Sequence, residues 1–417
     1  MKKKFWLINH YSGITAFVEG GRHYWFAKEL VRRGYEPTVF CCNVDHDRGG
    51  FFFPENKLWQ EKEVPSGAKY VFVRSNLYGD NGKQRVLNMI RFSLNMLKVG
   101  KEYAKKYGKP DVILASSVHP LTVYAGERLA KKFGVPCVAE IRDLWPESIF
   151  AYFPEKRGKW YAKMLYWGER RMYERADAVV MTWPGAKDYL LEQGWDKTID
   201  MSKVYHIGNG VDLEGFDQNV VDHPFSDPDL EAPGYFKAVY AGSIRKVNNL
   251  GVLVEAAAEL QRRGDKRVKI LVWGSGDELE TLQKRAEELK LTNLVFKGRT
   301  DKKNIPSLLT QCDCAILHNS STALDKYGQS QNKFIEYLAS GRPILMTYSV
   351  GYSVCKARNC GLELDAQTPE KIADALERLA NMPREEYETM ARNARETAKS
   401  YDFKAHTDKL VEIVENL

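Results

Sequence analysis

One polar segment in the second half of the chain has the residue types needed to bind a diphosphate. In the stretch AGSIRK, Ser243, Arg245 and Lys246 stand between a strand-like apolar run and an amphipathic stretch. The entry to a helix offers free backbone amides, and neighbouring cations stabilise phosphate charge. The alternative interpretation is that both cations are ordinary surface charge.

A second segment, SQNKFIEYLASGRPIL, places a lysine and a carboxylate on one helix face. Lys333 and Glu336 are three residues apart, and Gly341 and Pro343 mark the end of the helix. The Glu336 carboxylate can accept both hydroxyls of a ribose while Lys333 reaches a phosphate. An ordinary ion pair between the two residues is the alternative. Another strand-like run, LVFKGRT, ends beside Arg299, where its backbone can border a base.

The first half of the chain has charged loops where two predicted strands end. Ligands of open α/β sheets bind beyond the carboxyl ends of the strands. Four charges follow one strand in AEIRDLWPES, namely Glu140, Arg142, Asp143 and Glu147. Charge at a strand end favours substrate or catalytic groups over a solvated turn. His119 follows another strand in SSVHPLT, and its alternatives are a functional group and a core histidine.

A glycine-containing loop, HYSGITAFVEGG, precedes the first predicted helix. Gly20 and Gly21 lie just before a helix that begins near Arg22, whose free amides can meet an anion or a sugar oxygen. The loop is not GxGxxG, and no acidic residue closes a second strand, so a dinucleotide fingerprint is excluded. A purely structural turn is the alternative.

No residue pattern in the sequence predicts a metal or another cofactor. The seven cysteines include no CxxC pair and several lie in apolar runs, which indicates reduced, buried thiols rather than metal ligands. The DxD-like string Asp45-His46-Asp47 lies in a polar loop after a strand, and we interpret it as solvated.

The elements that position these residues follow a βαβ rhythm. Short apolar runs rich in β-branched residues alternate with amphipathic stretches, and the pattern restarts after residue 234. Between 206 and 234 periodicity is lost and Gly, Pro, Asp and Asn gather, as in a linker. We therefore predict an α/β fold of two Rossmann-like, doubly wound domains that face a cleft. The predicted domains are 1–207 and 208–399, with 400–417 as a helix that crosses back to the first.

Charge is distributed unevenly along the 417 residues, whose net charge is +7. Residues 1–200 hold 33 Lys and Arg against 23 Asp and Glu, whereas 201–417 hold 29 against 32. This asymmetry argues against nucleic acid as a partner of the whole chain and favours an anionic surface for the first half. Segments 82–109 and 155–175 mix basic with apolar and aromatic residues, as helices on an anionic bilayer do; the alternative is that their apolar faces are domain core.

Hydropathy predicts a cytoplasmic protein that is peripheral to a membrane. No run of about 18 apolar residues, the length of a spanning helix, occurs in the sequence. The first residues pass from lysines directly into a strand-like run rather than into a signal-peptide core.

Taken in order, these motifs resemble the retaining glycosyltransferases of family 4, which have the GT-B architecture, over nearly the whole chain. The resemblance rests on the GG before the first helix, EIRDLWPES, IGNGVD, AGSIRK, WGSGDELE and SQNKFIEYLASGRPIL. EIRDLWPES together with SQNKFIEY resembles the branch that builds bacterial O-antigen and capsule repeats, including N-acetyl-L-fucosamine transferases.

The resemblance implies a donor site and an acceptor site. Glu336 would bind the ribose, and Arg245 and Lys246 would face the diphosphate of a nucleotide sugar, taken as UDP-linked and N-acetylated. The implied donor residues are Gly20, Gly21, Ser243, Arg245, Lys246, Arg299, Asn332, Lys333 and Glu336. The residues implied on the catalytic, acceptor side are His119, Arg142 and Asp143. Where the family often has a glutamate, eight positions before the ribose glutamate, this chain has Gly328, so the donor sugar stays open.

The expected reaction retains the anomeric configuration and uses no protein nucleophile and no metal. The leaving phosphate takes the acceptor proton while the cations stabilise its charge. A membrane surface would make a polyprenyl-diphosphate-linked saccharide the acceptor. Two other classes remain: a nucleotide-sugar epimerase, which needs no acceptor, and a non-catalytic nucleotide-binding subunit.

Overall fold

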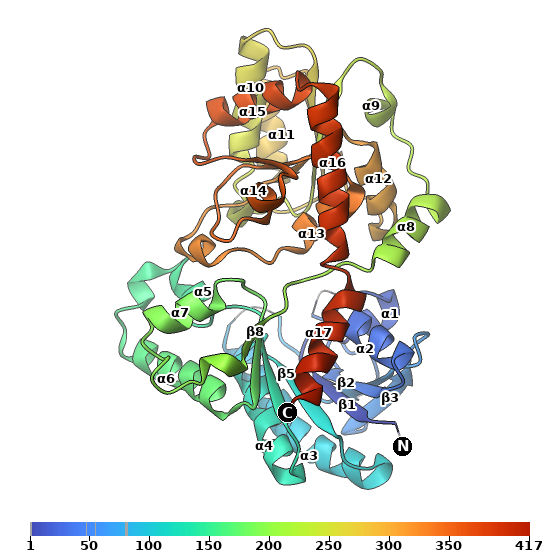
Figure 1. The fold of residues 1–417 in the computed structure, drawn as a ribbon, viewed down its shortest axis with the longest axis vertical. Coiled ribbons are helices and arrows are strands. Elements are labelled where there is room, and N and C mark those ends of the chain that lie inside the picture. Colours follow the sequence, from blue (N-terminus) through green and yellow to red (C-terminus); the bar gives the residue numbers. More distant parts are fainter. Residues whose placement is uncertain (1, 47, 55, 80–81) are drawn as a thin grey trace. The chain divides into compact units, whose positions relative to one another are not determined.

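The computed structural model describes residues 2–46, 48–54, 56–79 and 82–417. The chain folds into two compact units, Met1–Gly208 with Phe403–Leu417 and Asn209–Asp402, and each is an α/β domain (Figure 1). The predicted fold class is confirmed: two doubly wound domains, with a C-terminal helix that belongs to the first.

The first unit has an eight-stranded sheet with the order β3-β4-β2-β1-β5-β6-β7-β8. All neighbouring strands are parallel except β3 and β4, which are antiparallel. The strands are β1 Lys4–Ile8, β2 Glu36–Cys42, β3 Trp59–Glu63, β4 Lys69–Val73, β5 Val112–Ser116, β6 Cys137–Ile141, β7 Ala178–Met181 and β8 Val204–His206.

Helices cover both faces of this sheet, which is why its central strands are continuous apolar runs. Along β1, Phe5 and Leu7 pack toward α2 and α17, whereas Trp6 and Ile8 pack toward α3 and α4. The helices are α1 Thr15–Val18, α2 Arg22–Arg32, α3 Lys83–Tyr107, α4 Pro120–Phe133, α5 Glu147–Phe150, α6 Trp160–Arg175, α7 Ala186–Glu192 and α17 Phe403–Glu415, with 3-10 turns η1 Pro154–Lys156 and η2 Met201–Lys203.

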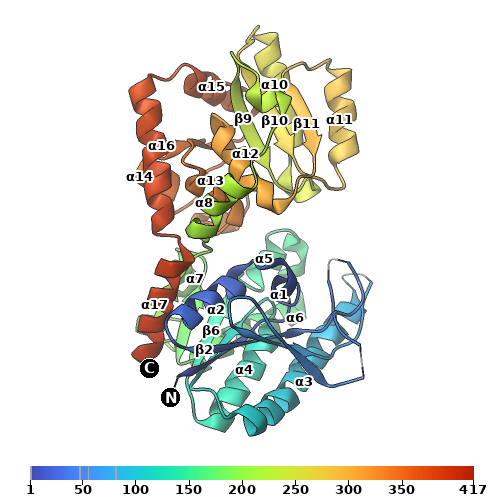
Figure 2. The same ribbon diagram turned by 90° about the vertical axis from the view of Figure 1, so that its right-hand side faces the viewer.

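The C-terminal helix α17 lies beside α2 (Figures 1 and 2). The Phe403 ring meets Phe26 edge to face, with the ring centroids 5.4 Å apart. Arg33 donates to Asp408, and Lys3 pairs with Glu415 at 2.7 Å. The final segment is therefore part of the core of the first unit rather than an appendage.

The second unit has a parallel six-stranded sheet with the order β11-β10-β9-β12-β13-β14. The strands are β9 Phe236–Ala241, β10 Val268–Trp273, β11 Leu294–Gly298, β12 Cys314–Leu317, β13 Ile344–Met346 and β14 Gly361–Glu363. The helices are α8 Leu213–Asp222, α9 Pro228–Glu231, α10 Gly251–Arg262, α11 Leu279–Glu288, α12 Ile305–Gln311, α13 Asn332–Ser340, α14 Val354–Arg358, α15 Pro369–Ala380 and α16 Arg384–Lys399, with 3-10 turns η3 Lys246–Asn248, η4 Lys302–Asn304 and η5 Ala323–Tyr327.

Both sheets reverse their strand order at a corresponding place. In the first unit β1, β2 and β4 follow one another outward, and β5 then returns to the other side of β1. In the second unit β9, β10 and β11 run outward, and β12 returns beside β9. Ligands of doubly wound sheets bind at the carboxyl ends of the strands at such a switch point. The loops after β1 and β5, and after β9 and β12, are therefore the places to examine for function.

No helix within the described ranges combines the length and the apolar character that crossing a bilayer requires.

Candidate functional site

The loop after β9 presents two exposed cations at the switch point of the second unit. Ser243 Oγ donates to Asn248 Oδ1 at 2.9 Å, and Asn248 Nδ2 donates to Asn319 Oδ1 at 3.1 Å, which ties this loop to the loop after β12. Arg245 and Lys246 are exposed, and within the described residues neither has an ion-pair partner. Their charge is thus available to an anion at this edge.

Glycines let the loops after β9 and β10 lie against each other. A Cβ atom at Gly274 would lie 1.8 Å from the carbonyl oxygen of Gly242, and one at Gly276 would lie 2.0 Å from that of Ile244. The backbone of Ile244 donates to the Ser275 carbonyl at 2.9 Å across this contact. The motif WGSGD is therefore architecture: it positions the loop that carries the cations.

Lys333 and Glu336 do not form the simple ion pair that the helix spacing allows. Lys333 Nζ donates instead to the Tyr240 hydroxyl at 3.0 Å, and burial lowers the pKa of the lysine to about 8. Glu336 is half-buried, and burial raises the pKa of its carboxyl group, although Lys302 and Lys333 oppose this shift. No group in the described part of the chain hydrogen-bonds to the Glu336 carboxylate, so a ligand hydroxyl can do so.

The predicted donor residues of the second unit gather at one edge of its sheet. A Cβ atom at Gly242 would lie 2.9 Å from Lys333 Cδ, which shows how closely the lysine approaches the loop after β9. Arg299 is exposed just after β11, and Asn332 is exposed at the first position of α13. Sequence reasoning missed Tyr240, because a strand residue gives no signal that its hydroxyl meets a lysine 93 positions away.

The loop that would carry the family glutamate has its own conformation here. Gly328 has φ 92° and ψ −161°, a backbone conformation that essentially only glycine adopts. Asp325 is turned inward to cap its own turn, since the backbone N–H of Thr322 donates to its carboxylate at 2.7 Å. A glutamate at position 328 would be strained in this backbone conformation.

In the first unit, the charges that the sequence places at the end of β6 divide into two groups. Glu140 is fully buried and accepts from Arg22 Nε at 2.7 Å, with His23 Nε2 at 2.8 Å from its other oxygen. Burial alone would raise the pKa of Glu140, but Arg22 and His23 hold it well below its usual range. Arg22 also donates to the carbonyl of Ile207 at 2.9 Å, which fixes the chain after β8. Glu140 therefore has a structural role.

Glu147 is likewise engaged, whereas Arg142 and Asp143 stand nearer to solvent. Glu147 accepts from Arg157 at 3.1 Å and from the Tyr166 hydroxyl. Asp143 is exposed, and Arg142 is half-buried beside it, with its carbonyl accepting from Trp183 Nε1 at 3.1 Å. Their predicted role on the acceptor side remains a prediction.

His119 caps the start of α4 and is buried rather than open to solvent. Its Nε2 lies 2.7 Å from His10 Nδ1, which joins the loops after β1 and β5 at the switch point. Burial, with the charges of Arg85 and His46, lowers the pKa of His119 to about 3, so the ring is neutral. Sequence reasoning missed His10, and no local signal marks it.

The two predicted glycines occupy the turn before α2. Gly21 has φ 90°, a left-handed conformation that favours glycine, whereas Gly20 has an ordinary φ. A Cβ atom at Gly20 would meet only the Val18 carbonyl oxygen, at 3.8 Å, so space is open beside it. Gly21 is explained by the turn, and the sugar contact predicted for Gly20 stays a prediction.

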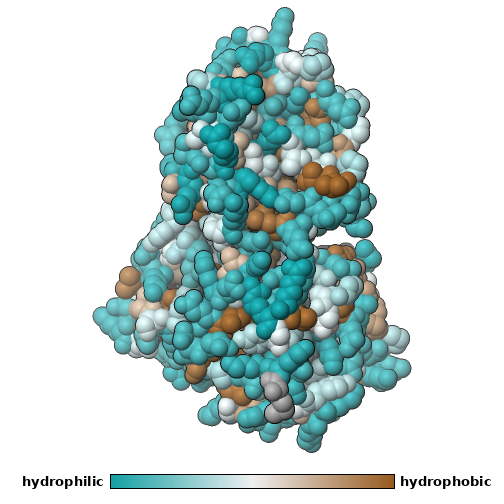
Figure 3. Space-filling model, turned by 45° about the vertical axis from the view of Figure 1, so that its right-hand side comes forward, coloured by the Kyte–Doolittle hydropathy of each residue, from teal (hydrophilic) through white to brown (hydrophobic). Residues whose placement is uncertain are grey.

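The core interpretation of the basic segments holds for one face of α3, and its other face is exposed. Phe92 and Met96 are core, whereas Leu87 and Leu94 are 55% and 60% exposed. On α6, apolar side chains at positions 160, 164 and 167 are exposed, and Trp160 is 79% exposed. The face drawn in Figure 3 is mostly hydrophilic and carries small, separate apolar patches.

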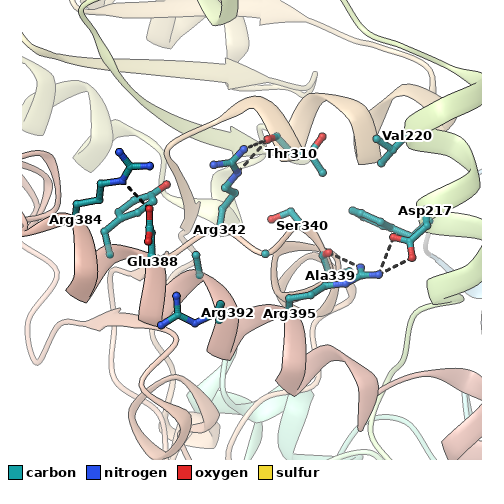
Figure 4. A pocket seen from close by; sticks show the side chains of 14 residues that line it. Asp217, Val220, Thr310, Ala339, Ser340, Arg342, Arg384, Glu388, Arg392 and Arg395 are labelled. Atoms are coloured by element: carbon teal, nitrogen blue, oxygen red, sulfur yellow. Dashed lines mark hydrogen bonds and ion pairs between the residues drawn. The ribbon is translucent and has the colours of Figure 1, made fainter.

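A cavity of about 1000 Å³ in the second unit is lined by four arginines (Figure 4), and none of the predicted donor residues is part of its lining. Thr310 precedes β12 and Arg342 precedes β13, so the cavity is at the amino ends of these strands. Arg342 donates to the Thr310 carbonyl at 3.0 Å, and Arg395 donates to Asp217 at 2.8 Å. These polar contacts hold side chains of the cavity wall to one another, and the cavity is at the opposite ends of the strands from the predicted donor residues.

The fold and the site define a two-domain GT-B protein whose second domain presents an edge suited to a nucleoside diphosphate. Residues 24–214 match the family model Glycosyltransferase Family 4, and residues 224–397 match Glycosyl transferases group 1. Each unit of the chain therefore matches a glycosyltransferase family model, and together the two units have the GT-B fold.

Among its relatives, the chain is 24% identical over 216 residues to the putative teichuronic acid biosynthesis glycosyltransferase TuaH of Bacillus subtilis, covering 50% of each chain. It spans less than two thirds of the length of the curated relatives it matches. Sucrose-phosphate synthase from Thermosynechococcus elongatus has the same fold, with a TM-score of 0.71, 17% identity and coverage of 100% and 99%. Anabaena HepE in complex with UDP gives a TM-score of 0.68 at 14% identity, with both chains covered completely.

Proposed function

We propose that this protein transfers a sugar from a UDP-sugar to a lipid-linked saccharide in the synthesis of a bacterial surface polysaccharide. The observation that carries the proposal is the Glu336 carboxylate, half-buried and without a hydrogen-bond partner in the described chain, on the same helix as Lys333. A half-buried carboxylate without a hydrogen bond lowers stability unless a ligand donates hydrogen bonds to it. A ribose diol supplies the two donors it needs.

The phosphates of the donor are held by cations from two elements. Arg245 and Lys246 reach from the loop after β9, and Lys333 stands against the same loop from α13. As the bond between sugar and phosphate breaks, charge grows on the diphosphate, and these three groups stabilise it without reorganisation. The acceptor hydroxyl attacks from the face the phosphate leaves and passes its proton to that phosphate, so configuration is retained.

The donor sugar and the acceptor are assigned to the first unit. Gly20 leaves open space beside the turn before α2 for the transferring sugar, taken as N-acetylated. The exposed carboxylate of Asp143, with Arg142 and His119, lines the acceptor side. His119 is buried and its Nε2 is bonded to His10, so it positions the loop after β5 rather than contacting the acceptor hydroxyl itself. The transfer needs no metal in this scheme.

Two names among the comparisons support the choice of donor and pathway. HepE is described in complex with UDP, and TuaH as a putative glycosyltransferase of teichuronic acid biosynthesis. The lipid-linked acceptor is supported by the exposed apolar side chains of α3 and α6, which stand among lysines and arginines. Such faces bind anionic membranes through apolar burial and charge together.

The donor assignment is tested by calorimetric titration with UDP, GDP, ADP, CMP and dTDP. We expect UDP to bind and Glu336→Ala to weaken it by about 1 to 3 kcal/mol, because two hydrogen bonds to a charged group are lost. Glu287→Ala, at an exposed position of α11, is the matched control and should bind as the native protein does. Equal UDP affinity in Glu336→Ala would remove the ribose assignment.

Turnover assays separate the proposed transferase from other classes. Release of UDP from a UDP-sugar should depend on added lipid-linked saccharide. Conversion of the donor alone would indicate an epimerase, and tight nucleotide binding without turnover over a panel of donors and acceptors would indicate a binding subunit.

Membrane binding is tested by co-sedimentation with vesicles containing phosphatidylglycerol at low salt. The double variant Trp160→Ala, Trp167→Ala should reduce the bound fraction several-fold, because both indoles are exposed on one face of α6. Tyr235→Ala, which removes an exposed aromatic ring from the second unit, is the control. No binding of the native protein would overturn the membrane assignment while leaving the donor site untouched.

A further inference from the structure

Three potential metal ligands from separate elements meet at the carboxyl edge of the first sheet. They are His10 in the loop after β1, Cys42 at the end of β2, and His46 in the loop after β2. One ligand atom from each lies within 4.8 Å of the others. The backbone N–H of Cys42 donates to the His10 carbonyl at 2.9 Å, so two of the three positions are fixed to each other.

Each imidazole uses its Nδ1 atom in a contact with a neighbouring aromatic side chain. His10 Nδ1 is bonded to His119 Nε2 at 2.7 Å, and His46 Nδ1 to the Tyr78 hydroxyl. The Nε2 atoms of both rings are inaccessible; the His10 ring has the Asn88 side chain beside it as a hydrogen-bonding group, whereas His46 Nε2 has no hydrogen bond within the described residues. The buried His46 nitrogen needs a partner, since buried polar atoms are nearly always satisfied, and the His10 ring and the Cys42 sulfur lie close enough to share one.

The surroundings match the outer shell of a metal site. Metal-bound histidines usually hydrogen-bond through their other nitrogen, which fixes the tautomer, and His119 and Tyr78 offer those bonds here.

The thiol is placed among hydrogen-bond donors. Asn88 Nδ2 lies 4.0 Å from the Cys42 sulfur and directs a donor toward it, and the same side chain stands beside the His10 ring. A cation that displaces the thiol proton would satisfy the sulfur and both imidazoles at once.

We propose that His10, Cys42 and His46 bind one Zn²⁺ ion through Nε2, Sγ and Nε2. Two imidazoles and a thiolate are the ligands that Zn²⁺ prefers, with bonds of about 2.0 to 2.3 Å and a fourth position for water. The ligand atoms need to close by roughly an ångström from their present separation to form a tetrahedron. Binding releases the Cys42 proton to solvent.

The sequence indicates no such site, because its three ligands are not close together in the chain. His46 falls in the Asp45-His46-Asp47 string interpreted as solvated, but its ring is half-buried and held by Tyr78; Asp47 lies outside the described residues. With Zn²⁺ on His10 Nε2, the proton of His10 stays on Nδ1 and donates to His119. The ion would thus fix the orientation of His119 through His10, without itself contacting the nucleotide sugar.

The test is metal content and cobalt spectroscopy on the full-length protein, independent of any transfer activity. After purification with Zn²⁺ and removal of loosely bound metal, we expect one Zn²⁺ per chain. Co²⁺ in its place should show a thiolate-to-cobalt charge-transfer band and the visible absorption of a tetrahedral site.

The chain contains a matched control, since Cys41 and Cys42 are adjacent, equally buried and in different core clusters. Cys42→Ala and His46→Gln should lose the Zn²⁺ and the cobalt bands, while Cys41→Ala retains both. Because His46 is half-buried, its variant should fold even where Cys42→Ala does not. Folded native protein without stoichiometric Zn²⁺, or Zn²⁺ retained in His46→Gln and folded Cys42→Ala, would overturn the proposal.

Discussion

The lysine of the donor edge should make nucleotide binding depend on pH. Burial lowers the pKa of Lys333 to about 8, against an ordinary value of 10.5. The groups that face it are Glu336 on its own helix, the Tyr240 hydroxyl on β9 and His318 after β12. Burial lowers the pKa of His318 to about 4 and raises that of the Tyr240 hydroxyl well above its ordinary value. Neither group therefore changes its charge between pH 7 and pH 9, and Lys333 is the group that titrates near pH 8.

The magnitude follows from the pKa of Lys333. Without nucleotide, roughly nine tenths of the lysine is charged at pH 7 and about one tenth at pH 9. A bound diphosphate keeps the amine charged, so binding above pH 8 must take up a proton. Affinity for UDP should therefore fall about tenfold from pH 7 to pH 9, or by about 1.4 kcal/mol.

Calorimetry measures both the affinity and the proton. At pH 9 the binding enthalpy should vary with the ionisation enthalpy of the buffer, with uptake close to one proton, whereas at pH 7 it should hardly vary. Lys333→Met should bind weakly at both pH values, with the tenfold change abolished. Equal UDP affinity at pH 7 and pH 9 in the native protein, or an unchanged pH dependence in Lys333→Met, would refute the assignment of Lys333 to the phosphates.

Two further changes test the architecture. Glu140→Gln leaves Arg22 buried without its counter-charge and should lower the free energy of unfolding by about 3 to 5 kcal/mol, measured by urea titration. The stability that Glu140 contributes in the native protein is present above the ordinary pKa of a carboxyl group and is lost only as pH falls through its depressed folded pKa. The control is Glu388→Gln, in an exposed ion pair, which should change the free energy of unfolding little. Gly274→Ala forces a Cβ atom to 1.8 Å from a backbone oxygen and should lower stability by about 1 to 3 kcal/mol or more, with Gly251→Ala nearly neutral in the same thermal-unfolding assay.

The fold could be predicted because its signals are local. The apolar runs of both sheets are continuous, as parallel strands covered on two faces must be, and amphipathic stretches separate them. The two interpretations of α3 could have been separated too. Its buried residues 92, 96, 99 and 103 recur at helical spacing, and the exposed residues 86, 87, 90 and 94 form another stripe.

The site could be predicted only in part because its decisive contacts are not local. Glu140 has the same appearance in sequence as Asp143, yet it meets Arg22, which is 118 positions away. His119 has the position of a functional loop residue, but its partner His10 is 109 positions away. A single sequence does not contain these pairings, since register and topology decide them. The residue types did indicate which strand ends carry the candidate site.

The described polar contacts divide the chemistry between the two units. At the edge of the first sheet, Arg22, Glu140 and Glu147 have protein partners, and His10 and His119 are neutral. At the edge of the second sheet, Arg245 and Glu336 have no protein partner among the described residues. A charged ligand gains most where charge is uncompensated, and a neutral one where strong charges are already satisfied. This difference is why we expect the nucleotide at the second unit and sugar hydroxyls, which need directed hydrogen bonds, at the first, where the exposed Asp143 carboxylate is available to them.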